Sequence, residues 1–324
     1  MKRITLASLL VMPFICIAQY TYKNLDVNFL ETDKAVKEYT YENLRLYPVY
    51  AKEGFKTEFK SLGKYMTLQE ALAKNKVKIT EKSNSGTVNT LLVENVSADT
   101  IIIITGDVIK GGKQDRIIDK DVLLKPKSGK KDLSVYCVES GRWSARSNAA
   151  IAKNFEPTAF TQYENKGSMS LRKVVEKEKD QSKVWSKVDE LNTANKTTTG
   201  TKTYTAITSS ADYNKKLENY IRFFKNKFVN DSTVIGVVIV SGDKVLGCDM
   251  FANHQLFSQQ FESLLHSYAT EAFLKGKPVN IAAKTVKDYM NRLLVDEKTQ
   301  QVTVKEKGNA FTDNNKKLRV SVFD

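Results

Sequence analysis

The fold is decided by the stretch Thr100–Leu124, TIIIITGDVIKGGKQDRIIDKDVLL. Its two apolar runs, Thr100–Thr105 and Ile117–Leu124, are rich in β-branched residues and therefore predict strands. Between them lies a polar segment that contains Gly111 and Gly112. Because glycine adopts positive φ without the steric cost that other residues meet, we expect a hairpin or a bulge at this pair.

The glycine pair is followed by three polar side chains that could meet a ligand: Lys113, Gln114 and Arg116. An amide both donates and accepts hydrogen bonds, and a guanidinium group offers a planar fork for carboxylate or phosphate. Gly106 and Gly111 resemble the start of a phosphate loop, but a Walker A loop needs Lys directly after its second glycine, then Ser or Thr, then a helix. Here Gly112 intervenes, Gln114 replaces the hydroxyl residue and a strand follows. The sequence therefore argues against a nucleoside triphosphate site.

A second polar cluster, YCVESGRW, spans Tyr136–Trp143. It overlaps the end of the predicted strand Leu133–Val138, where Val135, Cys137 and Glu139 would share one face. This carboxylate then lies either in water at the end of the sheet or buried against an arginine of the two clusters. We take six polar residues as candidate ligand-binding residues: Lys113, Gln114, Arg116, Glu139, Arg142 and Trp143. The alternative is a buried network of structural ion pairs.

Basic residues outnumber acidic ones, with 51 Lys and Arg against 37 Asp and Glu and a formal net charge of +14. Much of the surplus lies between Gly106 and Lys153, a segment that holds 11 basic and 6 acidic residues. If the two polar clusters face one cleft, an anionic small molecule is the natural occupant, whereas a solvated basic surface is the alternative explanation. Nucleic acid is not an expected partner, because interleaved aromatic residues and a recognised nucleic-acid motif are both lacking.

The N-terminal residues 1–18, MKRITLASLLVMPFICIA, have the pattern of a secretory signal peptide, with Lys2 and Arg3 before an apolar run that ends at Ala18. Cys16 lacks the preceding small residue that a lipoprotein signal needs, so we expect cleavage after Ala18 and an exported product, periplasmic or secreted. Removal of 18 of the 324 residues leaves 306 and lowers the net charge from +14 to +12. A retained N-terminal anchor is the alternative, and no later stretch is apolar for long enough to span a bilayer.

The predicted elements indicate an α+β protein, in which an N-terminal antiparallel β-sandwich-like region precedes a helical segment and a C-terminal α+β region. One short helix in the β-rich region has a capping box at Thr67 and Glu70. Residues 168–191 have helical spacing that a charged KEKDQSK segment interrupts, and the apolar run Val234–Val240 predicts a buried strand. We expect a signal peptide at residues 1–18, an N-terminal extension at 19–40 and a β-rich region at 41–160. A helix with a polar linker is expected at 161–203, and an α+β region that packs on the β-rich one at 204–324.

Catalytic and metal sites find little support in the sequence. His254 and His266 are its only histidines, which excludes a histidine-rich metal site and leaves a serine triad unsupported. The sequence indicates no metal and no particular cofactor. A hydrolase stays open as an alternative, with Glu139 or Asp249 as general base and the cluster arginines holding an anion.

Two cysteines lie beyond the predicted signal peptide, Cys137 and Cys248. In an exported protein they could form a disulfide, although buried free cysteines commonly behave as small apolar residues. Cys137 could also act as a nucleophile with His254 as its base.

Several motifs occur in order along the chain: NLRLYPVY, LQEALAKNKVKITE, TVNTLLVEN, TGDVIKGGKQDR, VYCVESGRW and VIGVVIVSGDKVLGCDMF. In this order they resemble the ARG and Rhodanese-Phosphatase-superfamily-associated Protein domain, a bacterial family of unestablished activity, over residues 41–290. The family name implies an association with ADP-ribose and phosphate chemistry. Asp115 stands where Asn is expected in the family. The resemblance implies these signature positions: Gly112, Lys113, Gln114, Arg116, Cys137, Glu139, Arg142 and Trp143. The leading hypothesis is an exported binding or structural domain whose polar cluster suits an anionic small molecule, and a purely structural envelope protein is a further alternative.

Overall fold

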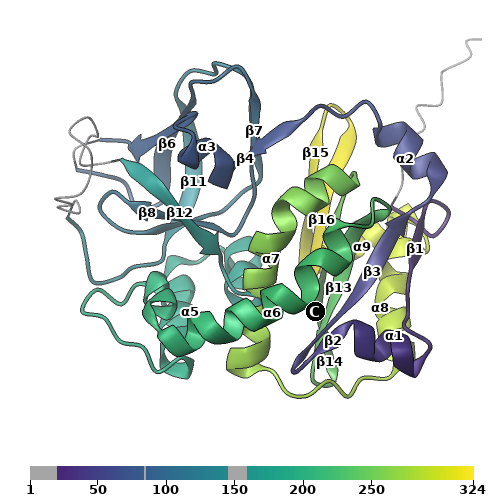
Figure 1. Ribbon diagram of the computed structural model, residues 1–324. Helices are drawn as coiled ribbons and strands as arrows, with labels where there is room; N and C mark the ends of the chain where they lie inside the picture. Colours follow the sequence, from purple (N-terminus) through teal and green to yellow (C-terminus); the bar gives the residue numbers. More distant parts are fainter. Residues whose placement is uncertain (1–19, 84, 145–158) are drawn as a thin grey trace, which may run out of the picture.

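A seven-stranded antiparallel sheet with helices on both faces forms one half of the molecule (Figure 1). The computed structural model describes residues 20–83, 85–144 and 159–324. Strands of this sheet follow the order β1-β3-β13-β14-β16-β15, with β2 paired to β3. They are β1 (Leu25–Val27), β2 (Thr40–Tyr41), β3 (Leu44–Ala51), β13 (Val234–Ser241), β14 (Lys244–Phe251), β15 (Gly308–Asp313) and β16 (Lys316–Phe323).

Helices cover the two faces of this large sheet in pairs, α6 with α7 on one side and α8 with α9 on the other (Figure 1). The central strand β13, VIGVVIVS, is buried at all eight positions, as expected for a strand that is covered on both faces. The helices of this half are α1 (Asp33–Glu38), α2 (Glu53–Phe59), α6 (Ala211–Val229), α7 (His254–Lys275), α8 (Ala283–Leu294) and α9 (Glu297–Lys307).

The other half is a half-barrel of short strands with a hydrophobic core of its own. Six strands follow the order β12-β8-β9-β11-β6-β5, and a bridge between Thr80 and Ala159 joins its two ends. A three-stranded sheet, β10-β7-β4, shares this core, and helix α3 (Leu68–Ala73) follows β4. The strands are β4 (Tyr65–Thr67), β5 (Val77–Glu81), β6 (Thr90–Asn95), β7 (Thr100–Ile103), β8 (Asp107–Gly111), β9 (Arg116–Ile118), β10 (Val122–Leu124), β11 (Lys131–Cys137) and β12 (Phe160–Lys166).

A helical segment connects the two halves after β12. It consists of α4 (Met169–Lys173), the π-helix η1 (Val174–Glu178), α5 (Gln181–Ala194) and the 3-10 helix η2 (Tyr204–Ser209). Lys179 has a φ of 51°, in the left-handed region, and this residue separates η1 from α5. The interruption predicted from the charged KEKDQSK segment is therefore confirmed.

The predicted α+β class is confirmed, but the β-rich region is arranged differently from a sandwich. It curls into a half-barrel because β5 and β12 meet at the Thr80–Ala159 bridge. The run predicted as one strand, Ile117–Leu124, is two strands in two sheets, β9 and β10. Residues 44–51, which the sequence placed in the β-rich region, pair with β13 in the large sheet instead. The capping box at Thr67 and Glu70 is confirmed.

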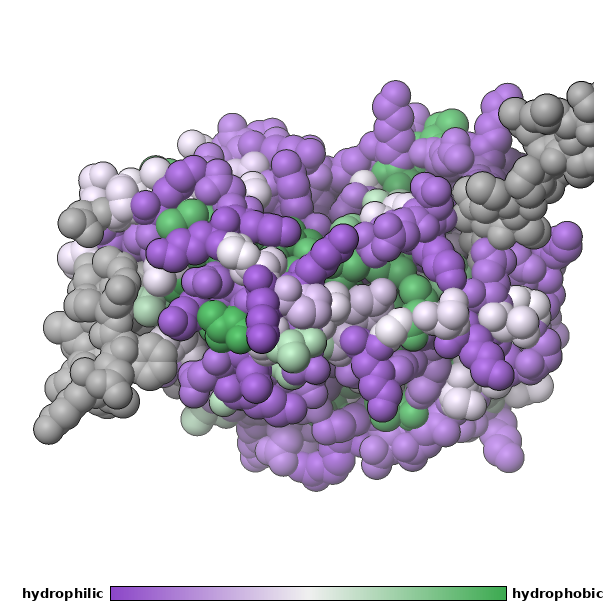
Figure 2. Space-filling view, turned by 90° about the horizontal axis from the view of Figure 1, so that it is seen from above, coloured by the Kyte–Doolittle hydropathy of each residue, from purple (hydrophilic) through white to green (hydrophobic). Residues whose placement is uncertain are grey.

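The surface is mainly hydrophilic when the molecule is seen from above (Figure 2). The hydrophobic side chains visible on this face lie mostly in its middle, among longer hydrophilic ones (Figure 2). Within the described residues, no helix has the length and apolar character needed to cross a bilayer. The predicted signal peptide, residues 1–18, lies outside the described part of the chain.

Candidate functional site

The double glycine forms the turn between β8 and β9, where β12 passes very close to the backbone. Gly111 and Gly112 have φ values of 142° and 46°, which side-chain-bearing residues rarely adopt. A Cβ at Gly111 would overlap the Ala159 carbonyl, and one at Gly112 would overlap the ring of Phe160. Both glycines are thus required by backbone conformation and by close contact with β12.

Arg116 points into the protein rather than toward solvent, and its side chain is 0% exposed. Its Nη2 lies 3.6 Å from Glu81 Oε1, and its Nη1 donates to the Gln114 carbonyl at 2.8 Å. The guanidinium carbon also lies 5.8 Å from the ring centroid of Trp143 and 5.9 Å from that of Phe160. Arg116 is therefore enclosed by a carboxylate, a carbonyl and two aromatic rings.

Glu139 is paired with Arg142 through two hydrogen bonds, from Nε to Oε1 at 3.0 Å and from Nη2 to Oε2 at 2.6 Å. The Asp115 N–H donates to the same carboxylate at 3.0 Å. Burial alone would raise the pKa of Glu139, but the hydrogen bonds from Arg142 and the Asp115 N–H hold this pKa below its ordinary value. Arg142 Nη1 also donates to the Gly112 carbonyl at 2.7 Å, which ties this pair to the glycine turn.

Asp115 connects the turn to the helical segment that leads into the other half of the molecule. Its Oδ2 accepts hydrogen bonds from Thr203 Oγ1 at 2.9 Å and from Thr205 Oγ1 at 3.1 Å. A β-bridge between Glu139 and Thr203 runs beside these contacts. We call residues 111–116 with Glu139, Arg142 and Trp143 the signature cluster, and its charges are met within the protein.

The remaining candidates of the signature cluster lie nearer the surface. Lys113 Nζ donates to the Ser85 carbonyl at 3.0 Å and lies 5.6 Å from the Trp143 ring centroid. Trp143 is 46% exposed, whereas Gln114 is 4% exposed. Lys113 and Trp143 are thus the candidates that a molecule in solution could reach most easily.

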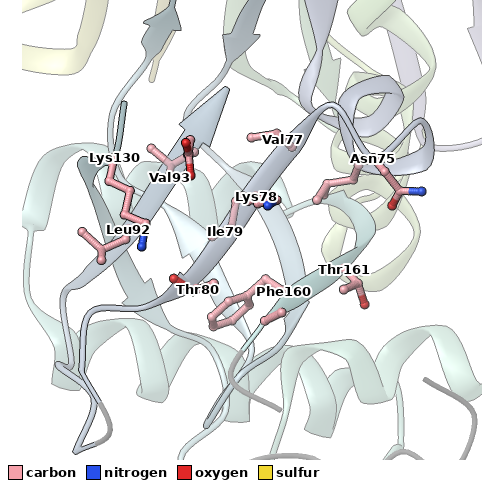
Figure 3. Close-up of a pocket in the computed structure, with 13 residues that line it drawn as sticks. Asn75, Val77, Lys78, Ile79, Thr80, Leu92, Val93, Lys130, Phe160 and Thr161 are labelled. Carbon is pink, nitrogen blue, oxygen red and sulfur yellow. The ribbon is translucent and has the colours of Figure 1, made fainter. Parts of the chain in front are cut away.

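A pocket of about 380 Å³ lies on the half-barrel between β5, β6 and β12 (Figure 3). Several of its lining residues belong to the buried core, among them Val77, Ile79 and Phe160. Lys78 extends from β5 and Lys130 from the residue before β11, and both are exposed. The remaining lining residues are Leu72, Asn75, Thr80, Leu92, Val93, Glu94, Ala159 and Thr161.

The signature cluster contacts the residues of this pocket that lie at the start of β12. Phe160 lines the pocket, and the same ring lies against Gly112 and the Arg116 guanidinium group. Ala159 also lines the pocket, and its carbonyl accepts a hydrogen bond from the Gly112 N–H at 3.1 Å. The turn and Arg116 therefore fix the position of the pocket wall that β12 supplies.

A family model described as the ARG and Rhodanese-Phosphatase-superfamily-associated Protein domain matches residues 34–321. The chain belongs to this family. The match extends through both halves of the molecule, so the half-barrel and the large sheet are parts of one family domain. Neither the curated proteins nor the solved structures include a match to the chain.

A second charged cluster in this family domain, which we call the junction network, was not expected from the sequence apart from Asp249. Arg172 donates to Asp249 through Nη1 at 3.0 Å and Nη2 at 2.8 Å, and Tyr268 donates to the same carboxylate at 2.7 Å. Arg319 bridges Asp249, at 3.1 Å, and Asp121, at 3.0 Å. The network also includes Glu176 and Ser321.

Asp249 has little freedom to act as the general base that the hydrolase alternative needs. Burial alone would raise its pKa, but Arg172 and Arg319 lower the pKa of this carboxyl well below its usual range. A carboxylate with a lowered pKa is a weak base, and hydrogen bonds already occupy both oxygens of Asp249.

The burial of Arg172 in the junction network could not be recognised from the sequence. Ser168 has the residue type of a helix N-cap, but no local pattern indicates that Arg172 is buried.

Both cysteines are free and buried, so the structure contains no disulfide between Cys137 and Cys248. Cys137 lies on β11 of the half-barrel and donates to the Val88 carbonyl at 3.4 Å, whereas Cys248 lies on β14 of the large sheet. Burial raises the pKa of the Cys137 thiol to about 11, which disfavours the nucleophilic thiolate. The ring nitrogens of His254 lie 2.7 and 2.9 Å from the carbonyls of Val234 and Val229, and no hydrogen bond joins this ring to Cys137. Among the described residues, no group of His, Cys, Asp and Glu has the arrangement of a metal site.

Proposed function

We propose that this family domain binds an anionic small molecule in the pocket between β5, β6 and β12. The observation that carries the proposal is the pair of ammonium groups, Lys78 and Lys130. Both line the pocket, and neither makes an ion pair or a hydrogen bond with another described residue. Glu94 is the one carboxylate among the lining residues that the structure describes, so the lining carries a net charge of about +1 at neutral pH.

The rest of the lining favours a ligand with a polar body as well as a negative charge. Thr80 and Thr161 supply hydroxyl groups, Asn75 supplies an amide, and the core floor supplies apolar contact. A volume of about 380 Å³ lies within the range of small-molecule sites. The family description refers to the phosphatase superfamily, and the sequence resemblance implies ADP-ribose and phosphate chemistry, which makes ADP-ribose and sugar phosphates the first compounds to test.

In this proposal the signature cluster positions the pocket wall instead of contacting the ligand. Its charges already have partners inside the protein, and Arg116 and Gly112 hold the Phe160 ring that lines the pocket. The hydrolase alternative has weaker support, because the pKa values of Glu139 and Asp249 are both lowered. The oxygens of both carboxylates also accept hydrogen bonds within the protein.

A thermal-shift screen followed by calorimetry tests the proposed function. The compounds are ADP-ribose, nucleoside monophosphates, sugar phosphates and an aromatic carboxylate. We expect at least one of them to stabilise the protein and to bind more weakly as the salt concentration rises. If none of these anions stabilises the protein at millimolar concentration, the proposal is wrong.

Charge-reversal variants identify the site. Lys78→Glu combined with Lys130→Glu should weaken binding roughly tenfold or more, which corresponds to about 1.4 kcal/mol. Lys60→Glu combined with Lys64→Glu is the matched control, because it makes the same change of charge at two exposed lysines that follow α2 and lie outside the pocket lining. Equal binding by the pocket double variant and the wild type would place the ligand elsewhere.

We further propose that the protein is exported, on the evidence of the N-terminal sequence pattern. Fractionation of cells that express the full chain, combined with N-terminal sequencing of the product, tests this. A product that begins at Gln19 outside the cytoplasm is expected, and an uncleaved cytoplasmic chain would contradict export.

A further inference from the structure

A second cavity, of about 450 Å³, lies where the half-barrel, the helical segment and the edge of the large sheet meet. Asp119 and Asp121 come from the loop between β9 and β10, and Glu176 comes from the π-helix η1. Asn309 and Phe311 come from the edge strand β15. The other lining residues are Lys120, Lys177, Lys179, Gly308 and Ala310. Three segments far apart in the sequence thus build one cavity.

Glu176 lines this cavity with hydrogen-bonding capacity that the described residues leave unused. Its side chain is 2% exposed, and neither carboxylate oxygen accepts a hydrogen bond from a described residue. Its nearest cation is Arg319, whose Nη2 lies 3.7 Å from Oε1. Asp119 lines the same cavity, and its Oδ1 also has no hydrogen-bond donor among the described residues. Buried polar atoms normally have partners, so three such oxygens at one cavity indicate a missing donor.

Among the described residues around Glu176, the carboxylates outnumber the cationic groups by one, so one positive charge is missing. The carboxylates of Asp121, Glu176 and Asp249 surround only two guanidinium groups, those of Arg172 and Arg319. Both guanidinium groups are already committed, because each donates to Asp249 and Arg319 also donates to Asp121.

The lysines of the cavity do not correct this imbalance. Lys177 Nζ donates to the backbone carbonyls of Lys305 and Gly308. Lys120 and Lys179 are exposed, and neither forms an ion pair with a described residue. Lys166 is buried nearby, but it is paired with Asp107 at 2.5 Å.

We propose that this cavity binds an alkylammonium ion, whose N–H groups donate to Glu176 and Asp119 and whose carbon chain lies against Phe311. An ammonium group brings the two properties that the site lacks, several N–H donors and one positive charge. Without the ligand, Glu176 carries a proton in its place at acidic pH. Binding then releases that proton to solvent, so that a neutral carboxyl and an ammonium ion become an ion pair and one free proton.

The protonation behaviour of Glu176 agrees with this exchange. Burial, the largest influence, raises its pKa to about 7, and Asp121 and Asp249 add to the increase, whereas Arg319 and Arg172 oppose it. Alkylamines stay charged well above this pH, with pKa values of about 10. Competition between one proton and the ligand makes binding about tenfold tighter at pH 8 than at pH 6.

Isothermal titration of the wild-type protein with butylamine and cadaverine at pH 6, 7 and 8 tests the proposal. We expect binding that tightens about tenfold from pH 6 to pH 8, with roughly one proton released per site at pH 6 when buffers of different ionisation enthalpy are compared. Tetramethylammonium has the charge without N–H donors and should bind at least tenfold more weakly. Titration with a lysine-containing peptide shows whether the cavity also accepts the ammonium group of a protein side chain or only that of a free amine.

Two variants make the result specific to Glu176. Glu176→Gln should remove the proton release and most of the pH dependence. Glu178→Gln, two residues later on an exposed side chain that pairs with Lys183, should bind amines like the wild type. The proposal is overturned if the wild type binds neither amine, if tetramethylammonium binds as tightly, or if the two variants behave alike. Unfolding in denaturant confirms that both variants are folded.

Discussion

The signature cluster and the junction network are both charged and largely buried, but they differ in how their carboxylates are hydrogen-bonded and in their distribution along the chain. In the signature cluster, Glu139 and Arg142 form a close pair, and a network of hydrogen bonds extends from them. In the junction network, three carboxylates surround two arginines, and Glu176 accepts no hydrogen bond from a described residue. The hydrogen bonding of the carboxylates therefore separates a cluster suited to holding the structure from one that can exchange a proton or a cation.

Removal of Arg319 should have the largest effect, because this residue faces three carboxylates of the junction network. Arg319→Ala leaves these buried charges without their shared partner, and we expect a loss of roughly 3–5 kcal/mol in the free energy of unfolding. Arg292→Ala is the control, since this arginine is 48% exposed and its ion pair with Asp324 should contribute less than about 1 kcal/mol. Urea denaturation measures both, and similar losses would show that the junction network has no special role.

Removal of Arg116 should cost less, although the side chain is also fully buried. Its one carboxylate partner among the described residues, Glu81, lies at 3.6 Å, so Arg116→Ala removes the partner of one carboxyl group, whereas Arg319→Ala removes the partner of three. We expect a loss of roughly 3 kcal/mol in urea denaturation. Arg116→Met should recover part of this, because the longer side chain still fills the space beside Phe160. A loss below about 1 kcal/mol for Arg116→Ala would contradict a structural role for the signature cluster.

The same contrast shows what could be predicted from the sequence. The signature cluster lies within residues 111–143, and both of its motifs are visible as glycines and charges in a short stretch. The junction network joins Asp121, Arg172, Asp249 and Arg319, which only the folded chain brings together. Strand runs such as Val234–Val240 and the capping box of α3 could be predicted because their patterns are local.

Long-range pairing explains the parts that could not be predicted. Nothing in the sequence of residues 44–51 identifies the partner of strand β3, which pairs with β13, almost 200 residues later. The sequence did not reveal the pocket of Figure 3 for a similar reason. Lys78 and Lys130 line the same pocket only after β5, β6 and β12 have assembled.

Gly112→Ala should have an intermediate effect that links the signature cluster to the pocket. The new methyl group would overlap the Phe160 ring at a position with φ of 46°. We expect a loss of about 1–3 kcal/mol in the free energy of unfolding and weaker binding of any anion that occupies the pocket. Gly63→Ala is the control, because a Cβ there meets no atom within 4 Å. Unchanged anion binding by a folded Gly112→Ala protein would show that the turn does not position the pocket wall.

The most sensitive comparison replaces one buried carboxylate in each cluster, because their pKa values shift in opposite directions. The pKa of Glu139 is lowered, so its ionised form adds stability above its ordinary pKa of about 4.5, and this stability is lost as the pH falls through the lowered value. Glu139→Gln should therefore destabilise the protein by about 1–2 kcal/mol at both pH 5 and pH 8.

Glu176 should show the opposite sign, because its pKa in the folded protein is raised to about 7. From pH 4.5 to pH 7 the folded chain keeps a proton that the unfolded chain has lost, so stability decreases across this window and stays lower above it. Glu176→Gln removes that penalty. We expect this variant to gain roughly 2 kcal/mol more, relative to the wild type, at pH 8 than at pH 5. Urea denaturation at the two pH values measures the difference, and a gain that does not change with pH would show that Glu176 is already ionised at pH 5.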